Sequence, residues 1–358
     1  MIGKSFSENN AQEALGFNLF HKELHMWRKL SVLMTILVIL AVVLSGCTET
    51  ESTAQAGGDG AAQEPERTLE FIYVSHSPNI NVFQTMRAAS EDAAELLGNV
   101  EVRWMGPDTP GDANAQVDIL DTALGLNPDA IFTTTNNPDA YDDVVNRIAA
   151  ADIPVFTHNI DNPDTDRMAY VGQEFIPAGI QFGNIGIDML EERFPGRDTY
   201  KVGIFTGEAG NFALERRIEG TRRAFAADPR IELVDVFIYA WDQNEAYNVI
   251  NEVFNRHPDM VGAFGMDAFS EFIGKWVDDN GKNGEIIVGG FDITDTAIDY
   301  IERDAMQYLV GQNTYMQGFM PTMLAYMYIM ENKLPPQIIN TGAPVITIDN
   351  LEDAETSS

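Results

Sequence analysis

Cysteine is almost absent from this sequence: Cys47 is the single cysteine among 358 residues. One cysteine cannot form an intramolecular disulfide, and it cannot supply a metal site built from several thiolates. A lone cysteine is usually a small core residue or a spare thiol. The neighbours of Cys47, considered below, indicate a different role.

Basic side chains are also scarce. Lysine and arginine number 22 against 55 aspartate and glutamate residues, which gives a formal net charge of −33. Such a surface repels phosphate backbones and anionic lipid headgroups, which argues against nucleic-acid binding. The acidity is explained either by solubility alone or by adaptation to high salt, where counterions screen the repulsion. The scarcity of lysine beside aspartate fits the second explanation, and composition alone leaves both open.

Several catalytic motifs are missing from the region expected to fold. It contains no Gly-x-Ser-x-Gly turn, no His-Glu-x-x-His helix and no phosphate-binding Gly-Lys-Ser/Thr loop. Paired carboxylates can hydrolyse glycosides, but sugar receptors use the same residues as hydrogen-bonding groups. We therefore predict that the protein is not an enzyme and uses no metal or cofactor.

One stretch near the amino terminus is strongly hydrophobic. It runs from Leu30 to Leu44, follows Arg28 and Lys29, and is too short to span a bilayer comfortably. A secretory signal typically has a basic region, then an apolar core, then small residues before the site where the signal is cleaved. The ending Leu44-Ser45-Gly46-Cys47 resembles the lipobox of bacterial and archaeal lipoproteins. The resemblance implies cleavage before Cys47 and lipidation of its sulfur.

The segments on either side of this signal differ in character. Residues 1–25 are polar and have no evident role, so translation starts at Met1 or at Met26. Residues 48–67 contain too few hydrophobic side chains to offset the entropy of ordering, and we expect a flexible acidic tether there. The protein is then held outside the cytoplasm, in the periplasm or on the cell surface, by a lipid on Cys47. The alternative is a signal anchor that stays uncut.

The rest of the chain is long enough for two domains. Two series of short apolar runs alternate with amphipathic stretches. The predicted strands are 69–74, 100–104, 130–134, 153–157, 201–205, 233–239, 261–265 and 286–290, and the predicted helices are 82–97, 113–124, 141–150, 213–226, 244–256 and 269–277. This alternation predicts an α/β protein with two similar Rossmann-like lobes, each a parallel sheet covered by helices.

Hydrogen-bonding residues follow many of these strands. Ligands of open α/β sheets lie beyond the carboxyl ends of the strands, so facing lobes would form a ligand cleft. Carboxylates and amides bind hydroxyl groups, and a flat ring covers the apolar face of a sugar. Asn and Asp also favour turns and helix caps, which explains part of the pattern. That preference does not explain the aromatic Trp241, which follows the predicted strand 233–239.

The stretch from Leu69 to Leu351 resembles the ribose-type sugar-binding proteins of ABC importers, the type I periplasmic binding proteins. Each matching segment alone is weak evidence for the resemblance. Together, in the same order and at similar intervals, the segments are specific evidence. The segments are Ile153 to Asn159, Tyr170 to Gln173, Gly210 to Gly220, Gly289 to Asp292 and Gly311 to Gly318.

The resemblance implies a two-lobed fold with a multi-strand hinge and the ligand in the cleft between the lobes. Its N-terminal lobe comprises residues 68–172 and 313–343, and its C-terminal lobe residues 173–312 and 344–351. It implies an extracytoplasmic solute-binding protein that closes around a simple sugar or polyol and delivers it to an ABC permease. We expect a monomer.

The resemblance also implies the ligand-binding residues. Asn159 matches an acidic hydroxyl binder, Trp241 a stacking aromatic, and Asp292 a strand-end acid. The full set is His76, Asn79, Phe83, His158, Asn159, Gln173, Asn211, Glu215, Trp241, Asp267, Asp292 and Gln312.

The sequence departs from the family in the first lobe. Phe83 is the only aromatic left where relatives have two, and Asn159 is followed by Ile160 instead of arginine. The missing arginine argues against ribose held in the usual way. His76 and His158 either take its place as donors or are ordinary strand-end residues.

Other functions remain as alternatives. A receptor subunit for chemotaxis or a sensor kinase has the same sequence features as a transport subunit, and a nucleoside or signalling furanose is a possible ligand. A transcription regulator of this fold would need a helix-turn-helix before the first strand, where this chain has a signal and a tether.

Overall fold

The computed structural model describes residues 67–109, 111–239 and 242–354. The predicted signal, Cys47, almost all of the tether and Trp241 lie outside these ranges. None of the helices in the described ranges combines the length and the apolar character that crossing a bilayer requires.

The first of two sheets has six strands, all parallel, in the order β11-β5-β4-β3-β1-β2. Strands β3, β4 and β5 are buried along their whole length, as expected for a sheet covered on both faces. The strands are β1 (Leu69–Val74), β2 (Val100–Met105), β3 (Ala130–Thr133), β4 (Val155–His158), β5 (Ala169–Gly172) and β11 (Ile338–Asn340).

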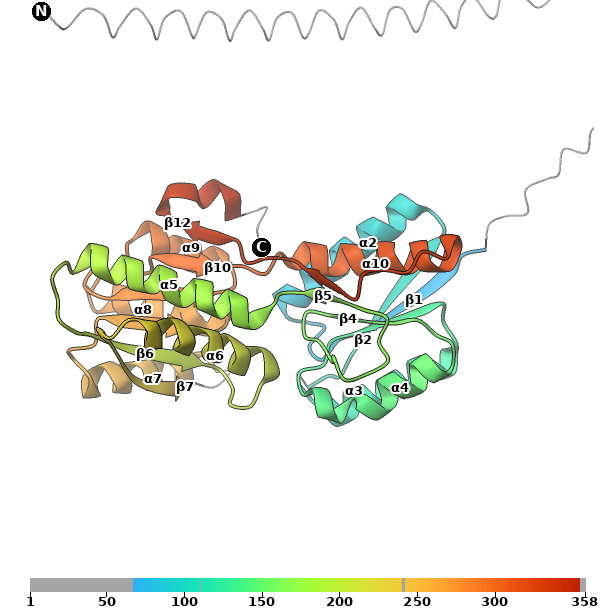
Figure 1. The fold of residues 1–358 in the computed structure, drawn as a ribbon, viewed down its shortest axis with the longest axis horizontal. Coiled ribbons are helices and arrows are strands. Elements are labelled where there is room, and N and C mark those ends of the chain that lie inside the picture. Colours follow the sequence, from blue (N-terminus) through green and yellow to red (C-terminus); the bar gives the residue numbers. More distant parts are fainter. Residues whose placement is uncertain (1–66, 110, 240–241, 355–358) are drawn as a thin grey trace, which may run out of the picture. The chain divides into compact units, whose positions relative to one another are not determined.

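Helices cover both faces of this sheet. Figure 1 shows α2 and α10 on one face and α3 and α4 on the other, and the buried clusters divide the same way. The helices are α2 (Asn81–Leu97), α3 (Ala113–Leu126), η1 (Pro138–Ala140), α4 (Asp142–Ala150) and α10 (Thr314–Glu331).

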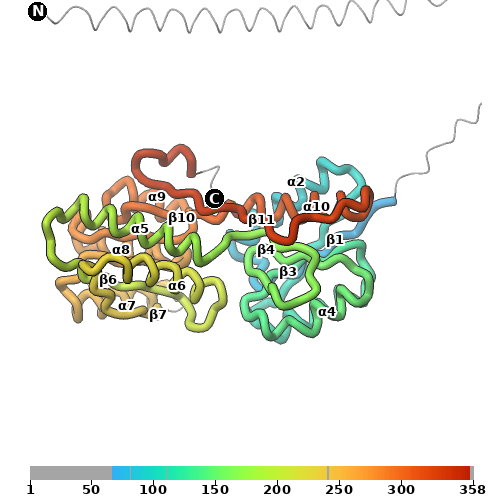
Figure 2. The backbone as a smooth tube through the Cα atoms, viewed as in Figure 1, coloured from blue at the N-terminus to red at the C-terminus, as the bar shows by residue number. Residues whose placement is uncertain are grey.

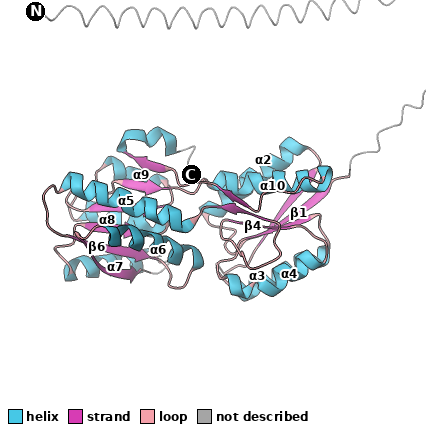
Figure 3. Ribbon diagram, in the orientation of Figure 1, coloured by secondary structure: helices cyan, strands magenta, loops and turns pink. Residues whose placement is uncertain are grey.

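The second sheet has the order β12-β10-β9-β8-β6-β7, and all of its pairs are parallel except β10 with β12. Figure 3 shows its strands lying among the helices that cover them. Its strands are β6 (Tyr200–Thr206), β7 (Ile231–Ile238), β8 (Gly262–Gly265), β9 (Ile287–Phe291), β10 (Tyr308–Val310) and β12 (Val345–Thr347). Its helices are α5 (Phe175–Arg193), α6 (Phe212–Ala227), α7 (Gln243–Arg256), η2 (Ala268–Ser270), α8 (Glu271–Asp279), α9 (Asp295–Glu302) and η3 (Ile348–Asp353).

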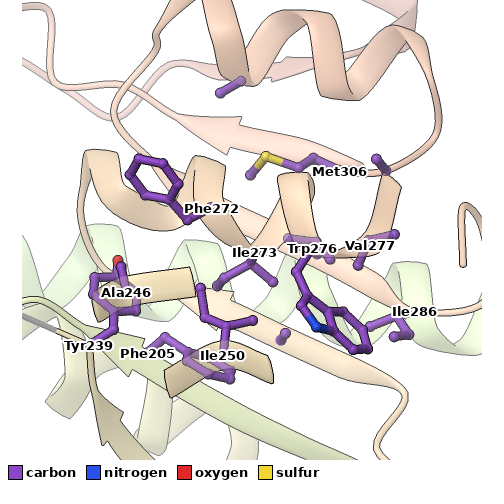
Figure 4. Packing of buried hydrophobic residues seen from close by; sticks show 14 of the residues in the cluster. Phe205, Tyr239, Ala246, Ile250, Phe272, Ile273, Trp276, Val277, Ile286 and Met306 are labelled. Atoms are coloured by element: carbon purple, nitrogen blue, oxygen red, sulfur yellow. The ribbon is translucent and has the colours of Figure 1, made fainter. Parts of the chain in front are cut away.

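Two apolar clusters hold these helices on the second sheet. One packs side chains of α5 and α6, such as Phe182 and Ile218, on one face. The other packs α7, α8 and α9 on the opposite face, where Ile250 and Trp276 lie with Met306 in the same buried cluster (Figure 4). Both sheets are therefore three-layer α/β units, as predicted.

The chain passes between the two sheets three times: from β5 to α5, from β10 to α10, and from β11 to β12 (Figure 2). The predicted fold class, two Rossmann-like lobes joined by several crossing segments, is confirmed. The predicted start of the fourth strand at Ile153 is wrong, because β4 begins at Val155. Pro154 has no N–H to donate to a neighbouring strand, and Asp152 has the φ of +61° of a turn.

Candidate functional site

Most predicted ligand residues lie just beyond the carboxyl ends of strands. In the first sheet Asn159 follows β4, and in the second sheet Asp292 follows β9. Both have left-handed backbones, with φ of 62° and 68°. Asn and Asp tolerate this conformation better than most residues, which explains why these types stand where a strand turns sharply.

Gln312 connects these two residues. Its Oε1 accepts a hydrogen bond of 3.3 Å from Asn159 Nδ2, and its Nε2 donates to Asp292 Oδ1. Gln312 follows β10 on a segment that crosses between the sheets, and only 6% of its surface is exposed. Predicted residues from both sheets therefore meet at a crossing segment.

Gln173 joins the crossing segments to one another. Its Nε2 donates to the carbonyl of Gly311 at 2.8 Å and to that of Gly342 at 3.2 Å. These two glycines lie on the second and third crossings, and Gln173 itself lies on the first. The side chain is 1% exposed, so it acts as an internal tie among the three crossings.

Arg217 was not predicted as a site residue, although it lies in the same network. Its Nη2 donates to Gln173 Oε1 at 3.1 Å and its Nη1 to the Met266 carbonyl at 2.9 Å, while the guanidinium lies 4.2 Å from the ring centre of Phe291. Burial lowers the pKa of Arg217, and the charges of Asp292 and Asp267 oppose that shift.

The sequence held a signal for Arg217. It lies on the buried face of α6 together with Leu214, Ile218 and Thr221. An arginine among the apolar positions of an amphipathic helix requires internal partners, because burying an unpartnered charge is very costly. In the ranges that the structure describes, its Nε still has no hydrogen-bond partner.

Asp267 is bonded to three protein donors. Its Oδ1 accepts from the Tyr239 hydroxyl at 2.6 Å and the Phe269 N–H at 3.0 Å, and its Oδ2 accepts from the Gly207 N–H at 2.8 Å. Burial raises the pKa of Asp267 to about 6, against the lowering effect of these hydrogen bonds. The carboxylate thus ties together the loops after β6, β7 and β8.

The two predicted histidines lie in an aromatic cluster at the carboxyl ends of β1 and β4 in the first sheet. His158 is fully buried, with ring centres 5.3 Å from Tyr73 and 5.9 Å from Trp104, and the ring of His76 meets Phe83 edge-on at 4.9 Å. Burial lowers the pKa of His76 to about 4 and that of His158 to about 3. Both rings are therefore neutral at pH 7.

The hydrogen bonding of these histidines differs. His76 Nδ1 lies 2.8 Å from Ser77 Oγ, whereas neither ring nitrogen of His158 has a partner among the described residues. Asn79, by contrast, is exposed, and its carbonyl accepts from Gln84. The structure therefore brings His76, Phe83 and His158 together and leaves Asn79 at the surface.

No group of three or more potential metal ligands occurs in the described part of the chain.

Asn211 and Glu215 organise the start of α6. Asn211 Oδ1 accepts from the N–H groups of Ala213 and Leu214, so it is the N-cap of the helix. Glu215 Oε1 accepts from the Gly210 N–H at 2.9 Å. The capping explanation weighed for the strand-end residues therefore accounts for Asn211.

A groove of about 750 Å³ runs along the exposed face of α6. Loops of the first sheet form its other wall, so both lobes line it, and Glu215 is the one predicted site residue among its lining. The lining residues are Asn137, Pro138, Asp139, Pro163, Asp164, Gly210, Phe212, Glu215, Arg216, Ile218, Glu219, Arg222, Arg223 and Ala226.

Comparison with known sequences gives a consistent set of relatives. Residues 71–333 match the family model described as periplasmic binding protein domain. The chain is 26% identical to a xylose/arabinose-binding protein of Sulfolobus acidocaldarius, over 81% of this chain and 74% of that protein. It is also 26% identical to the D-allose-binding periplasmic protein of Escherichia coli, over 64% of this chain and 74% of that protein.

Solved structures share the fold. An ABC transporter solute-binding protein of Burkholderia graminis, crystallised in complex with D-arabinose, superposes with a TM-score of 0.74 at 22% identity, covering 80% of this chain and 98% of that one. A glucose-galactose binding protein of Geobacillus stearothermophilus superposes with a TM-score of 0.72 at 23% identity, covering 80% and 99% of the two chains.

Proposed function

The chain belongs to the periplasmic binding protein domain family, which places it among extracytoplasmic solute-binding proteins, and we propose that its solute is a simple sugar or polyol taken up by an ABC importer. The names of its relatives support this ligand class: one binds xylose and arabinose, and another binds D-allose. The two relatives are each 26% identical to this chain and bind different sugars, so their names support a class of ligand and not one particular sugar.

The observation that carries the proposal is the polar link through Gln312. Asn159 from the first sheet and Asp292 from the second are bonded to the same side chain on a crossing segment. A ligand that binds both residues acts directly on the segments about which the lobes move. This placement supports the proposal that the lobes close around the ligand by a hinge motion, as periplasmic binding proteins in general do.

We further propose that the twelve predicted ligand residues contribute to one cleft, with Trp241 beneath the sugar ring. The lobe boundaries are those expected from the sequence, residues 68–172 with 313–343 and 173–312 with 344–351. Asp267, Gln173 and Asn211 act in this cleft mainly by holding loops and backbone, since their polar atoms already bond to protein.

The remaining parts of the proposal concern partners. A lipid on Cys47 anchors the protein to the cell membrane, and the tether lets the folded part approach an ABC permease. The protein acts as a monomer and performs no chemistry on its ligand. The neutral histidines and hydrogen-bonded carboxylates suit binding of an uncharged ligand by hydrogen bonds.

A thermal-shift screen tests the ligand class. Purified protein is heated with D-xylose, L-arabinose, D-allose, D-fructose, inositol, sugar alcohols and nucleosides, at both low and molar salt. A ligand at about a hundred times its Kd stabilises the folded state by about 2.7 kcal/mol, which raises Tm measurably. A rise with a nucleoside and with none of the sugars or polyols would overturn the proposal.

A further inference from the structure

Gln317 is a buried side chain that sequence reasoning did not place in the site. It lies on α10 and is 0% exposed. Its Nε2 donates to the carbonyl of Gln312 at 2.9 Å and to Thr341 Oγ1 at 3.2 Å, and its Oε1 accepts from Asn159 Nδ2 at 3.1 Å. Every polar atom of the Gln317 side chain is thus engaged with a crossing segment or with Asn159.

The orientation of the Gln317 amide is determined by its neighbours. The Gln312 carbonyl can only accept, so the nitrogen of Gln317 must face it. The Thr341 hydroxyl donates to the same carbonyl at 2.7 Å, so it has only lone pairs to offer Gln317. Both neighbours therefore require Nε2 on this side of the amide, which leaves Oε1 facing Asn159.

A second chain of hydrogen bonds leads to Asn159 from the other direction. Asp292 bears a carboxylate, which accepts hydrogen bonds, so Gln312 must turn its Nε2 toward it and its Oε1 toward Asn159. Two carbonyl oxygens, from Gln312 and Gln317, therefore face the side chain of Asn159. Only the NH₂ group of Asn159 can satisfy both of them.

Only the oxygen of the Asn159 side-chain amide is then free to bind a ligand. Its two N–H bonds are directed to Gln317 at 3.1 Å and Gln312 at 3.3 Å, and no described residue donates to its Oδ1. The backbone of Asn159 is held too, since its N–H donates to the Val171 carbonyl and its own carbonyl accepts from the Tyr170 hydroxyl. The side chain can neither rotate away nor flip without breaking these bonds.

We propose that Gln317 is a positioning residue that presents Asn159 to the ligand as a pure acceptor. The proposal rests on the proposed function and adds to it the polarity required of the ligand, which must donate a hydroxyl hydrogen to Asn159 Oδ1. Asn159 thus accepts a hydrogen bond from the ligand as a carboxylate would, but it carries no charge. An aspartate in its place would face two carbonyl oxygens, which repel a carboxylate.

A measurement without ligand tests the orientation. Side-chain amide hydrogen exchange of Asn159 is followed by NMR in the full chain with ¹⁵N-labelled asparagine, and the signal is assigned by its loss in Asn159→Asp. We expect Gln317→Leu to speed exchange of the Asn159 amide about tenfold or more, since one of its two acceptors is removed. Unchanged exchange would overturn the proposal, whatever the protein binds.

Gln116→Leu is the matched control. Gln116 is also a fully buried glutamine of the first lobe, and its Nε2 donates to the Val74 and Thr134 carbonyls on the α3 side of the sheet. We expect this variant to lose stability as Gln317→Leu does and to leave exchange at Asn159 unchanged. If it speeds that exchange equally, the effect is general loosening and the proposed role of Gln317 is wrong.

A double-mutant cycle with D-xylose and L-arabinose as probes tests the effect on binding. Gln317→Leu and Asn159→Asp should each weaken binding about tenfold, and the double variant should bind more tightly than Asn159→Asp alone, because one opposing oxygen is gone. Simple additivity of the two losses would contradict the proposed mechanism. If the wild type binds neither sugar, these two ligands are excluded, and the exchange experiment still decides the orientation.

Discussion

Asp267 is a predicted ligand residue whose carboxylate also binds the protein's own loops. Its two oxygens accept three hydrogen bonds from Tyr239, Gly207 and Phe269, and the side chain is nearly inaccessible. The loops after three adjacent strands therefore depend on one carboxylate. A residue type that suits sugar hydroxyls serves equally well to bind backbone N–H groups.

The raised pKa of Asp267 predicts a pH dependence of stability. The pKa rises from 3.8 to about 6 on folding, so the folded state holds the proton more tightly than the unfolded state. The stabilisation from this group is complete below pH 3.8 and is lost as pH rises through about 6. At about 1.4 kcal/mol per pKa unit, the loss is about 3 kcal/mol at most.

Urea unfolding of wild type and Asp267→Asn between pH 3.5 and 7.5 measures this effect. The asparagine variant is less stable overall, because its NH₂ group cannot accept from backbone N–H groups. As pH rises, the free energy of unfolding of the wild type should fall relative to that of the asparagine variant. A difference that stays constant over this range would mean that Asp267 titrates normally.

Arg217 and its neighbour Arg216 allow a second comparison. Arg217 is buried and bonded to Gln173 and Met266, whereas Arg216 is exposed and lies over the ring of Phe212. Lysine cannot reproduce both bonds of a guanidinium. We expect Arg217→Lys to lower the free energy of unfolding by about 2 kcal/mol or more.

The adjacent substitution is the control for this prediction. Arg216→Lys removes an exposed stacking contact and should change stability by about 0.5 kcal/mol or less. Urea titration of both variants decides the point. Equal effects of the two substitutions would show that the buried network contributes little to stability.

Helices α5 and α6 approach each other closely because glycines face one another between them. A methyl group on Gly179 would lie 2.3 Å from the Arg217 carbonyl, and one on Gly220 would lie 2.3 Å from the Ile176 carbonyl. This contact places the α6 backbone, and hence Arg217, at its depth in the core. Gly179 also explains why α5 escaped prediction, since glycines lower helix propensity.

The helix contact gives a prediction with an internal control. Gly220→Ala should destabilise the protein by about 1 to 3 kcal/mol, because backbone atoms of α5 must move aside. Gly125→Ala in α3 has open space around it and should raise stability by up to about 1 kcal/mol, as expected for alanine in a helix. Thermal unfolding of both variants measures these changes in stability. A neutral Gly220→Ala would mean that the two helices can separate at little cost.

The charge of the whole chain predicts a response to salt. With 55 acidic and 22 basic side chains, self-repulsion opposes folding at low ionic strength. Most ion pairs of the described residues are exposed and contribute little individually. If the acidity is an adaptation to high salt, Tm should rise markedly between low and molar KCl.

Sucrose serves as the uncharged control for this experiment, because it stabilises proteins without screening charge. A rise in KCl well beyond the rise in sucrose supports the adaptation. An unchanged Tm in KCl leaves solubility as the explanation of the acidity.

The proposed lipid anchor gives a prediction for the full chain. Cys47→Ser should release the protein from membranes and leave its ligand-induced rise in Tm unchanged, since Cys47 lies before the tether. Fractionation of cells that express the wild type and the variant measures this. Retention of the variant in the membrane fraction would indicate an uncut hydrophobic anchor.

The sequence by itself determined the layer architecture. The alternation of apolar runs and amphipathic stretches is local, so β1 lies at the predicted residues and α2 begins one residue earlier than predicted. The family resemblance is confirmed by the match over residues 71–333. The list of ligand residues stays a prediction, and Trp241 lies outside the described ranges.

Only the tertiary structure decided what the polar residues do. Asn159 is bonded to Gln312 and Gln317, which are 153 and 158 residues away in the chain. Hydrogen-bond polarity depends on which donors and acceptors face one another, and no local pattern encodes a partner so distant. The sequence therefore predicted that Asn159 belongs to the site, and the fold established that its amide hydrogens are already in use.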